Sequence, residues 1–225
     1  MTLHTDRTYE AELTALRDRL VDMAGQVEQM VVDAVRAVTE RNPELAQQTI
    51  QQDRKVNRAE MEIDEACMLL LARRQPVASD LRLVTTALKM VTDIERIGDV
   101  AVNLSERAID LATEPPVGQI DEALHGLGHL VAAMLRQAID AFARRDAEKA
   151  DEVLEMDDDA DERYHQIVRA LAQRIRDNPD KVEQNVALQS AAKQLERIGD
   201  HATNLAEQVI LLVRGQDLRH VGKLA

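Results

Sequence analysis

A twelve-residue phrase occurs twice in this chain and shows how the molecule is built. Residues 95–106 and 196–207 share the pattern E-R-I-G-D-x-A-x-N-L-x-E, with nine of twelve positions identical and a separation of 101 residues. Two unrelated segments would not agree so closely by chance. The chain therefore contains an internal duplication, and each copy should repeat the structure of the other.

The duplication extends well beyond this phrase. At a separation of 104, residues 34–38 resemble residues 138–142, and Asp53 matches Asp157. The separation falls to 101 after the second break, which is a length difference of three residues in one loop. We predict two copies of one three-helix unit. The expected divisions are a first unit at 1–112, a linker at 113–118, a second unit at 119–215 and a tail at 216–225.

The hydrophobic pattern is helical. From Leu188 onward, apolar residues recur at alternating spacings of three and four, which is typical of a helix packed in a bundle. No two-residue alternation predicts a strand, and eight Gly and five Pro favour long uninterrupted elements. The predicted fold is all-α, with two tandem, pseudo-symmetric three-helix bundles. Asn42 before Pro43, Ser79 with Asp80, and Asp146 are the expected N-caps, and Gly215 is expected to end the last helix. With the prolines, they place helices at 7–41, 43–74, 79–112, 119–145, 147–177 and 181–214.

Composition excludes several classes of protein. A formal net charge of −13 argues against nucleic-acid binding and against docking on an anionic membrane. The longest apolar run, residues 66–72, is too short to span a bilayer, and residues 1–12 lack the apolar core of a secretory signal. We therefore expect a soluble cytoplasmic protein. Cys67, the one cysteine, lies in an apolar run and is predicted to be a buried filler.

Each copy carries two choices that are unfavourable for a helix. A Glu and an Asp stand four residues apart in each phrase: Glu95 with Asp99, and Glu196 with Asp200. Like charges at this spacing destabilise a helix by about 0.2–0.5 kcal/mol. The interior glycines Gly98 and Gly199 each cost about 1 kcal/mol relative to alanine. A bound cation would offset both, with the glycine leaving space for an ion, a water or another helix.

Further acids on the preceding helices extend these candidate sites. Asp157 and Asp161 have the same spacing, and their counterparts in the first copy are Asp53 and Asn57. If the second and third helices of each unit pack together, Asp53 faces one acid pair, and Asp157 with Asp161 face the other. Carboxylate ligands suit Mg²⁺, Mn²⁺, Ca²⁺ or iron, and Zn²⁺ is a further candidate for the bound metal. The alternative is a solvated acidic face with ordinary salt bridges to Arg96 and Arg197.

The surroundings of the two acid pairs differ. At about 100° per residue, Glu196 lies roughly 130° from the apolar seam, so the acids should lie toward a surface. In the first copy an apolar row leads directly into Glu95, whereas the matching row in the second copy is mostly polar. We therefore predict that the first site is more enclosed. The two rows are Leu81, Val84, Leu88 and Val91, and Val182, Asn185, Gln189 and Ala192.

Other motifs are weaker. Glu162 and His165 have the E-x-x-H spacing of di-iron bundles, but the first copy lacks a second such motif. His201 is a minor ligand candidate, and the repeated Asn103 and Asn204 favour interhelical hydrogen bonds. No Gly-rich phosphate loop, G-x-S-x-G motif or Cys–His pairing is present, so we predict no catalytic residues and no enzyme.

The twin phrases resemble those of the PhoU family of phosphate-uptake regulators. Each holds that family's E/D-x-x-x-D motif, and residues 75–82, Q-P-V-A-S-D-L-R, are similar to the segment before its third helix. The resemblance implies a cytoplasmic, often dimeric protein that represses the phosphate-starvation response. It implies two partners, the ATPase subunit of the phosphate ABC transporter and the phosphate sensor histidine kinase. It also implies metal ions on the acid faces, with Asn57 leaving one pair incomplete.

Three hypotheses follow. The leading one is a signalling adaptor without catalytic activity, tuned by metal and linking transport to two-component signalling. The second is a carboxylate-bridged metalloenzyme or iron-binding bundle, which requires redox-active iron. The third is a purely structural helical dimer that binds no metal.

Overall fold

Six long helices build the molecule, and the all-α prediction is confirmed. The computed structural model describes residues 2–215, with side chains from residue 7 onward, and this part contains no strand. The helices are α1 (Thr2–Thr39), α2 (Pro43–Arg74), α3 (Ala78–Asp110), α4 (Gly118–Arg144), α5 (Ala147–Asp177) and α6 (Val182–Arg214), with a 3-10 turn at Pro179–Lys181. These bounds agree closely with the predicted ones, except that α1 begins five residues earlier. The predicted tail, 216–225, lies outside the described residues.

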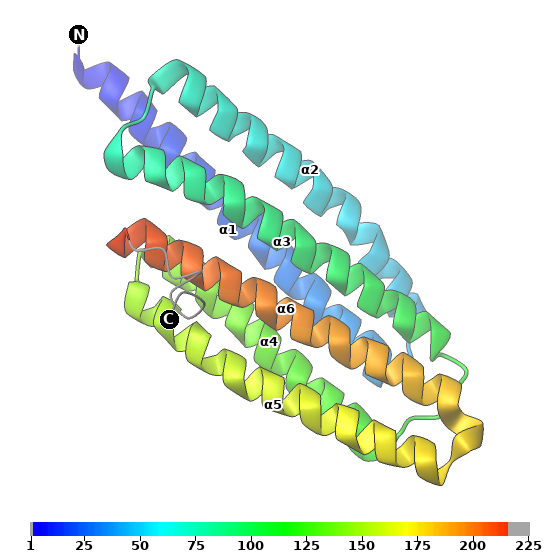
Figure 1. Cartoon of the computed structure of the whole chain (residues 1–225). Helices are drawn as coiled ribbons and strands as arrows, with labels where there is room; N and C mark the ends of the chain where they lie inside the picture. Colours follow the sequence, from blue (N-terminus) through cyan, green and yellow to red (C-terminus); the bar gives the residue numbers. More distant parts are fainter. Residues whose placement is uncertain (1, 216–225) are drawn as a thin grey trace.

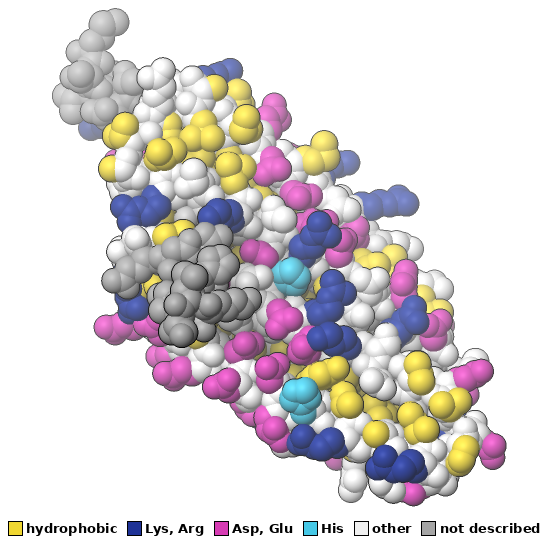
Figure 2. Space-filling model, in the orientation of Figure 1, with side chains coloured by type: hydrophobic (Ala, Val, Ile, Leu, Met, Phe, Trp, Pro, Cys, Tyr) yellow, Lys and Arg dark blue, Asp and Glu magenta, His cyan; other side chains and the backbone are white. Residues whose placement is uncertain are grey.

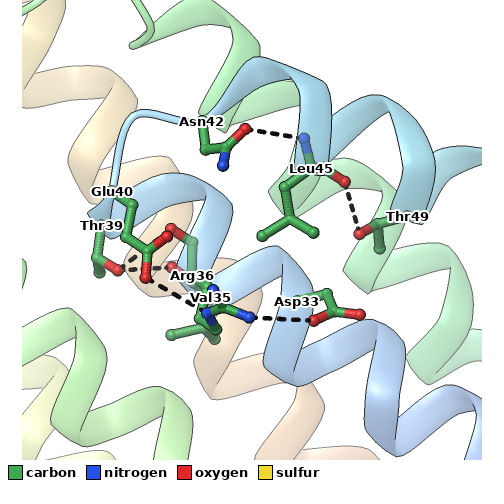
Figure 3. Close-up of polar contacts among 8 residues, drawn as sticks. All are labelled: Asp33, Val35, Arg36, Thr39, Glu40, Asn42, Leu45 and Thr49. Atoms are coloured by element: carbon green, nitrogen blue, oxygen red, sulfur yellow. Dashed lines mark hydrogen bonds and ion pairs between the residues drawn. The ribbon is translucent and has the colours of Figure 1, made fainter.

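Local sequence explains most of the helix boundaries. The Asn42 side chain accepts a hydrogen bond from the Leu45 backbone N–H at 3.0 Å, with Pro43 at the first helical position (Figure 3). Asp146 caps α5 in the same way, accepting from two backbone N–H groups at 3.0 and 3.1 Å. Gly215 ends α6 in the left-handed region, at φ 70°. These predicted caps are confirmed.

The predicted cap of α3 is wrong. This helix begins at Ala78, after Val77, whose side chain makes no capping hydrogen bond. Asp80 instead accepts a hydrogen bond from the Tyr9 hydroxyl at 3.1 Å, which ties the start of α3 to α1. A long-range partner has displaced the local capping role of this acid.

The two copies pack side by side (Figure 1). Helix α1 packs against α4 and α3 against α6, while α2 covers α1 and α3 and α5 covers α4 and α6. One continuous aliphatic core runs through both halves. The four inner helices are therefore buried on several sides, whereas α2 and α5 keep an outer face. Whether residues 1–112 and 119–215 act as separate domains stays a prediction.

Polar contacts also link the halves. Arg41, at φ 55° just after α1, forms an ion pair of 3.0 Å with Asp121 of α4, and both side chains are almost fully buried. Across the α3–α6 contact, His201 Nδ1 lies 3.0 Å from Asp93 Oδ1, and Asn204 Nδ2 lies 3.4 Å from the same oxygen. Of the two asparagines predicted to bond between helices, Asn204 is confirmed, whereas Asn103 is exposed.

Within residues 2–215, no helix combines the length and the apolar character that spanning a bilayer requires.

Candidate functional site

The repeated acids form two groups, one on each half. Asp53 of α2 lies close enough to Asp99 and Glu95 of α3 for their negative charges to repel one another. Glu60 of α2 belongs to the same group. We call these four residues the first acidic face. Asp157 and Asp161 of α5 likewise lie close enough to Glu196 and Asp200 of α6 for charge repulsion. These four residues form the second acidic face. The structure thus pairs the acids as the sequence predicted.

Crowding makes ionisation unfavourable on the first acidic face. Burial raises the pKa of Glu95 above its usual range, and the charges of Asp99 and Glu60 raise it further. Burial and then Asp99 raise the pKa of Asp53, although a hydrogen bond of 2.8 Å from the Asn57 amide partly opposes this. Asn57 therefore supports Asp53 where the second copy has the acid Asp161.

The second acidic face shows the same electrostatics. Burial raises the pKa of Asp157, and the charges of Asp161 and Glu196 raise it further. Partial loss of hydration raises the pKa of Asp200, although its side chain reaches solvent, and the charges of Glu196 and Asp157 raise it further. Figure 2 shows Asp and Glu side chains gathered along α5 and α6. On each face the carboxylates therefore repel one another, and their ionisation is less favourable than it is in water.

Basic side chains offset part of this charge. Arg96 lies 3.6 Å from Glu95 and 3.9 Å from Asp99, so the predicted salt bridge at the first face is present. At the second face the predicted partner is wrong: Arg197 donates to Gln194, and Lys193 contacts Glu196 at 2.5 Å instead. Lys193 has no counterpart in the first copy, where Thr92 stands.

Sequence reasoning missed Glu60. Its position seven residues after Asp53 places it on the same side of α2, two helical turns away. Its counterpart in the second copy is Tyr164, so the duplication did not mark it. The signal was available in helical spacing but not in the repeat.

The glycines of the phrase lie against neighbouring helices. A Cβ on Gly98 would meet Val56 of α2 at 3.4 Å, and one on Gly199 would meet Val131 of α4 at 3.5 Å. The space beside each glycine was expected to hold an ion, a water or another helix, and the structure shows side chains of a neighbouring helix there. Both distances are ordinary van der Waals contacts, so packing does not demand glycine at either position.

The prediction that the first site is more enclosed holds for the aspartates of the repeated phrase but not for its glutamates. Asp99 is half-buried, whereas its counterpart Asp200 is exposed. The side chain of Glu95 is 18% exposed and that of Glu196 is 14% exposed, so the two glutamates are equally sheltered. The apolar row that led to the prediction begins at Leu81, which is itself exposed.

The donor chemistry of both faces suits a hard cation, but no cage is preformed. Asp53 Oδ1 is buried without a hydrogen-bond partner, which leaves a carboxylate oxygen open to a ligand. Among residues 2–215, however, no three His, Cys, Asp or Glu side chains converge as metal ligands. Binding an ion would therefore require these side chains to change rotamer.

The residues of the E-x-x-H motif lie outside the bundle interior. Glu162 is exposed and accepts a hydrogen bond of 2.8 Å from Arg169, and the exposed His165 ring packs beside Tyr164. Di-iron bundles require such residues to project inward. His201 is engaged by Asp93 rather than by the acidic faces.

Exposed apolar side chains gather at the end of the molecule where α2 meets α3 (Figure 2). They belong to the last turns of α2, the connection and the first turn of α3: Met68, Leu69, Val77 and Leu81. Val77 is 73% exposed and Met68 61% exposed. Apolar surface of this kind is typical of protein–protein contact sites.

Comparison with known proteins identifies close relatives. The PhoU domain family matches residues 20–108 and 124–209. The phosphate-specific transport system accessory protein PhoU homolog of Pseudomonas putida is 43% identical over 99% of this chain and 87% of its own length. The PhoU protein of Escherichia coli K12 is 36% identical, over 97% and 90%.

Solved structures agree with these relatives. PhoU from Pseudomonas aeruginosa superposes with a TM-score of 0.89 at 42% identity, covering 92% of this chain and all of that one. The phosphate transport system regulatory protein PhoU from Streptococcus pneumoniae gives a TM-score of 0.87 at 25% identity, covering 93% and 99%. The likeness therefore extends over nearly the whole described fold.

Proposed function

Because the chain belongs to the PhoU family, we propose that it is an accessory regulator of a phosphate-specific transport system. Its role is to repress the phosphate-starvation response in the cytoplasm when phosphate is ample. The observation that carries this proposal is similarity over 99% of the chain to a protein bearing the accessory name. The expected partners are the transporter's ATPase subunit and the phosphate sensor histidine kinase, with the regulator acting as a homodimer.

The shape of the molecule supports an adaptor role. The outer faces of α2 and α5 are free of intrachain packing, and the apolar residues at the α2–α3 end offer a contact area. A regulator without a catalytic constellation works by binding partners, and exposed Met and Val side chains suit such contacts. We assign Met68 and Val77 to partner binding.

A deletion strain tests the regulatory role. The chain should restore low expression of a starvation-responsive phosphatase reporter in phosphate-rich medium, and pull-down should recover the kinase or the ATPase. Met68→Asp with Val77→Asp should abolish recovery, whereas the matched change Val186→Asp at the opposite end of the bundle should not. Failure of the unmodified chain to repress the reporter or to recover either partner, in high or low phosphate, would refute the proposal.

We further propose that metal ions bind the two acidic faces. The ligands would be Glu95, Asp99, Asp53 and Glu60 on the first face, and Glu196, Asp200, Asp157 and Asp161 on the second. A divalent ion would neutralise carboxylates whose ionisation is unfavourable in its absence. Of Mg²⁺, Mn²⁺, Fe and Zn²⁺, oxygen-only ligands favour the harder ions.

Elemental analysis tests this second proposal. Protein purified without an affinity tag should contain metal, and Mn²⁺ should raise the melting temperature. A variant with Glu95→Gln, Asp99→Asn, Glu196→Gln and Asp200→Asn should lose both effects. Metal-free protein with no response to Mn²⁺ would favour the structural-dimer hypothesis, while redox-active iron with oxygen consumption would favour the metalloenzyme.

A further inference from the structure

Two histidines meet on the surface of α4, away from both acidic faces. His125 and His129 are exposed, and their Nε2 atoms lie 3.2 Å apart. Their ring centroids are 4.3 Å apart and the rings are inclined by 78°, so the Nε2 edges approach more closely than the ring centres do. The two nitrogens therefore face each other across a short gap.

Two unprotonated nitrogens at this distance repel, so something positive must lie between them. A proton can do so, as an N–H···N hydrogen bond between neutral rings, and so can a metal ion. Tetrahedral Zn²⁺, with Zn–N bonds of about 2.0–2.1 Å, holds two ligand nitrogens about 3.4 Å apart. The observed 3.2 Å is close to that spacing.

We propose that His125 and His129 chelate a late first-row divalent cation such as Zn²⁺, Cu²⁺ or Ni²⁺ through their Nε2 atoms. Imidazole nitrogen suits these ions, whereas Mg²⁺ and Ca²⁺ prefer oxygen. The i, i+4 spacing on one helix holds the rings on the same side, so little movement is needed. Both rings bind as neutral imidazoles with the proton on Nδ1.

The surroundings tolerate a cation. The pair borders a small hollow between α1 and α4, lined also by Val32, Val35 and Arg36. Arg36 is the nearest fixed positive charge lining it, and its guanidinium is paired with Asp33 at 3.9 Å and Glu40 at 3.3 Å (Figure 3). Its charge is thus largely compensated.

Only the second copy carries this pair. The equivalent positions in the first copy are Val21 and Gly25, so the chelate is not part of the duplicated architecture. No third His, Cys, Asp or Glu joins it within residues 2–215, so the remaining coordination positions are open to water. The ion would bind independently of the acidic faces.

Copper spectroscopy and zinc calorimetry test the site on the full chain purified without a histidine tag, with excess Mg²⁺ present to occupy the acidic faces. Bound Cu²⁺ should show electron paramagnetic resonance coupling to two nitrogens. One zinc equivalent per chain should disappear in the His125→Ala, His129→Ala double variant. Each single variant should weaken zinc binding by more than the roughly 10–100-fold that loss of an outer-shell partner causes.

His165→Ala is the matched control, because it removes an exposed histidine that has no histidine partner. It should leave both signals unchanged. Because His125 and His129 are exposed, their variants should keep the helical circular dichroism of the parent. Coupling to fewer than two nitrogens, or unchanged zinc stoichiometry in the folded double variant, would show that the pair is only a hydrogen bond between neutral rings.

Discussion

The Val35 side chain of α1 occupies the space that any side chain on Gly128 of α4 would need. A Cβ on Gly128 would lie 2.5 Å from Val35 Cγ2 and 2.7 Å from Cγ1. Val35 is 5% exposed and belongs to the shared core, so moving it aside would cost packing contacts even though it borders the small hollow between α1 and α4. Gly128 therefore sets how closely the two halves approach along α1 and α4.

Gly128→Ala should lower the free energy of unfolding. Overpacking of a core costs about 1–3 kcal/mol, from which up to about 1 kcal/mol of improved helix propensity is recovered. Urea denaturation followed by circular dichroism measures the change. The double variant Gly128→Ala, Val35→Ala should relieve the clash, so a loss that persists unchanged in it would argue against this contact.

Gly199→Ala, in contrast to Gly128→Ala, should leave the free energy of unfolding unchanged or raise it. Its new Cβ would meet Val131 Cγ1 at 3.5 Å, which is an ordinary contact, and alanine favours the helix by up to about 1 kcal/mol. The same urea experiment should therefore show unchanged or increased stability. A large loss would mean that the phrase needs glycine for packing, contrary to the distances observed.

Asp121→Ala should be strongly destabilising. Removing one member of a buried ion pair leaves an unpaired charge and typically costs 3–5 kcal/mol, and Arg41 is only 6% exposed in its side chain. Asp121 also accepts a hydrogen bond from the Val117 backbone N–H at 2.5 Å. Thermal and urea unfolding should both report the loss.

The control for Asp121 is Glu162→Ala, which breaks an exposed pair with Arg169. It should change stability by less than about 0.5 kcal/mol. Equal effects of the two substitutions would show that burial of the Arg41–Asp121 pair does not matter.

Most of the fold was predictable because its signals are local. Periodic apolar residues, the caps at Asn42 and Asp146 and the terminating Gly215 lie within a few residues of the boundaries that they define. The cap at the start of α3 could not be predicted in this way, because Asp80 accepts a hydrogen bond from Tyr9, which is 71 residues away in sequence. The duplication gave the number of helices in each half but not how the halves meet.

The candidate site was predictable only in part for a related reason. Repeat and spacing located the four acids of the phrase and their facing partners Asp53, Asp157 and Asp161. They did not reveal Glu60 or Lys193, because each occurs in one copy only. Which base pairs with which acid depends on the side-chain conformations along α6, where Lys193 lies three residues before Glu196 and Arg197 turns to Gln194.

Asp200→Asn should raise the free energy of unfolding at pH 7. It removes a like-charge pair with Glu196, worth about 0.2–0.5 kcal/mol. Because the pKa of Asp200 is raised in the folded protein, folding favours the protonated form. The destabilisation caused by the Asp200 charge therefore sets in as pH rises through 3.8, the ordinary pKa of an Asp. It is complete above the raised pKa of Asp200 in the folded protein.

The gain from Asp200→Asn should accordingly shrink as pH falls toward 3.8. Urea denaturation across this pH range, compared with the distant substitution Asp180→Asn, measures it. A gain that grows on acidification would have the wrong sign for a raised pKa.

Cys67 should be unreactive in the folded protein. Its thiol is fully buried in α2, and burial raises its pKa to about 12, so the reactive thiolate is scarce at pH 8. Ellman's reagent should label the native chain slowly and the urea-unfolded chain at the rate of a free cysteine. Since the thiol reacts only when the chain opens, its labelling rate should rise with urea in step with unfolding and should rise further in Asp121→Ala. Rapid labelling of the native chain, at a rate that neither urea nor Asp121→Ala alters, would contradict the buried position that both the sequence and the structure assign to Cys67.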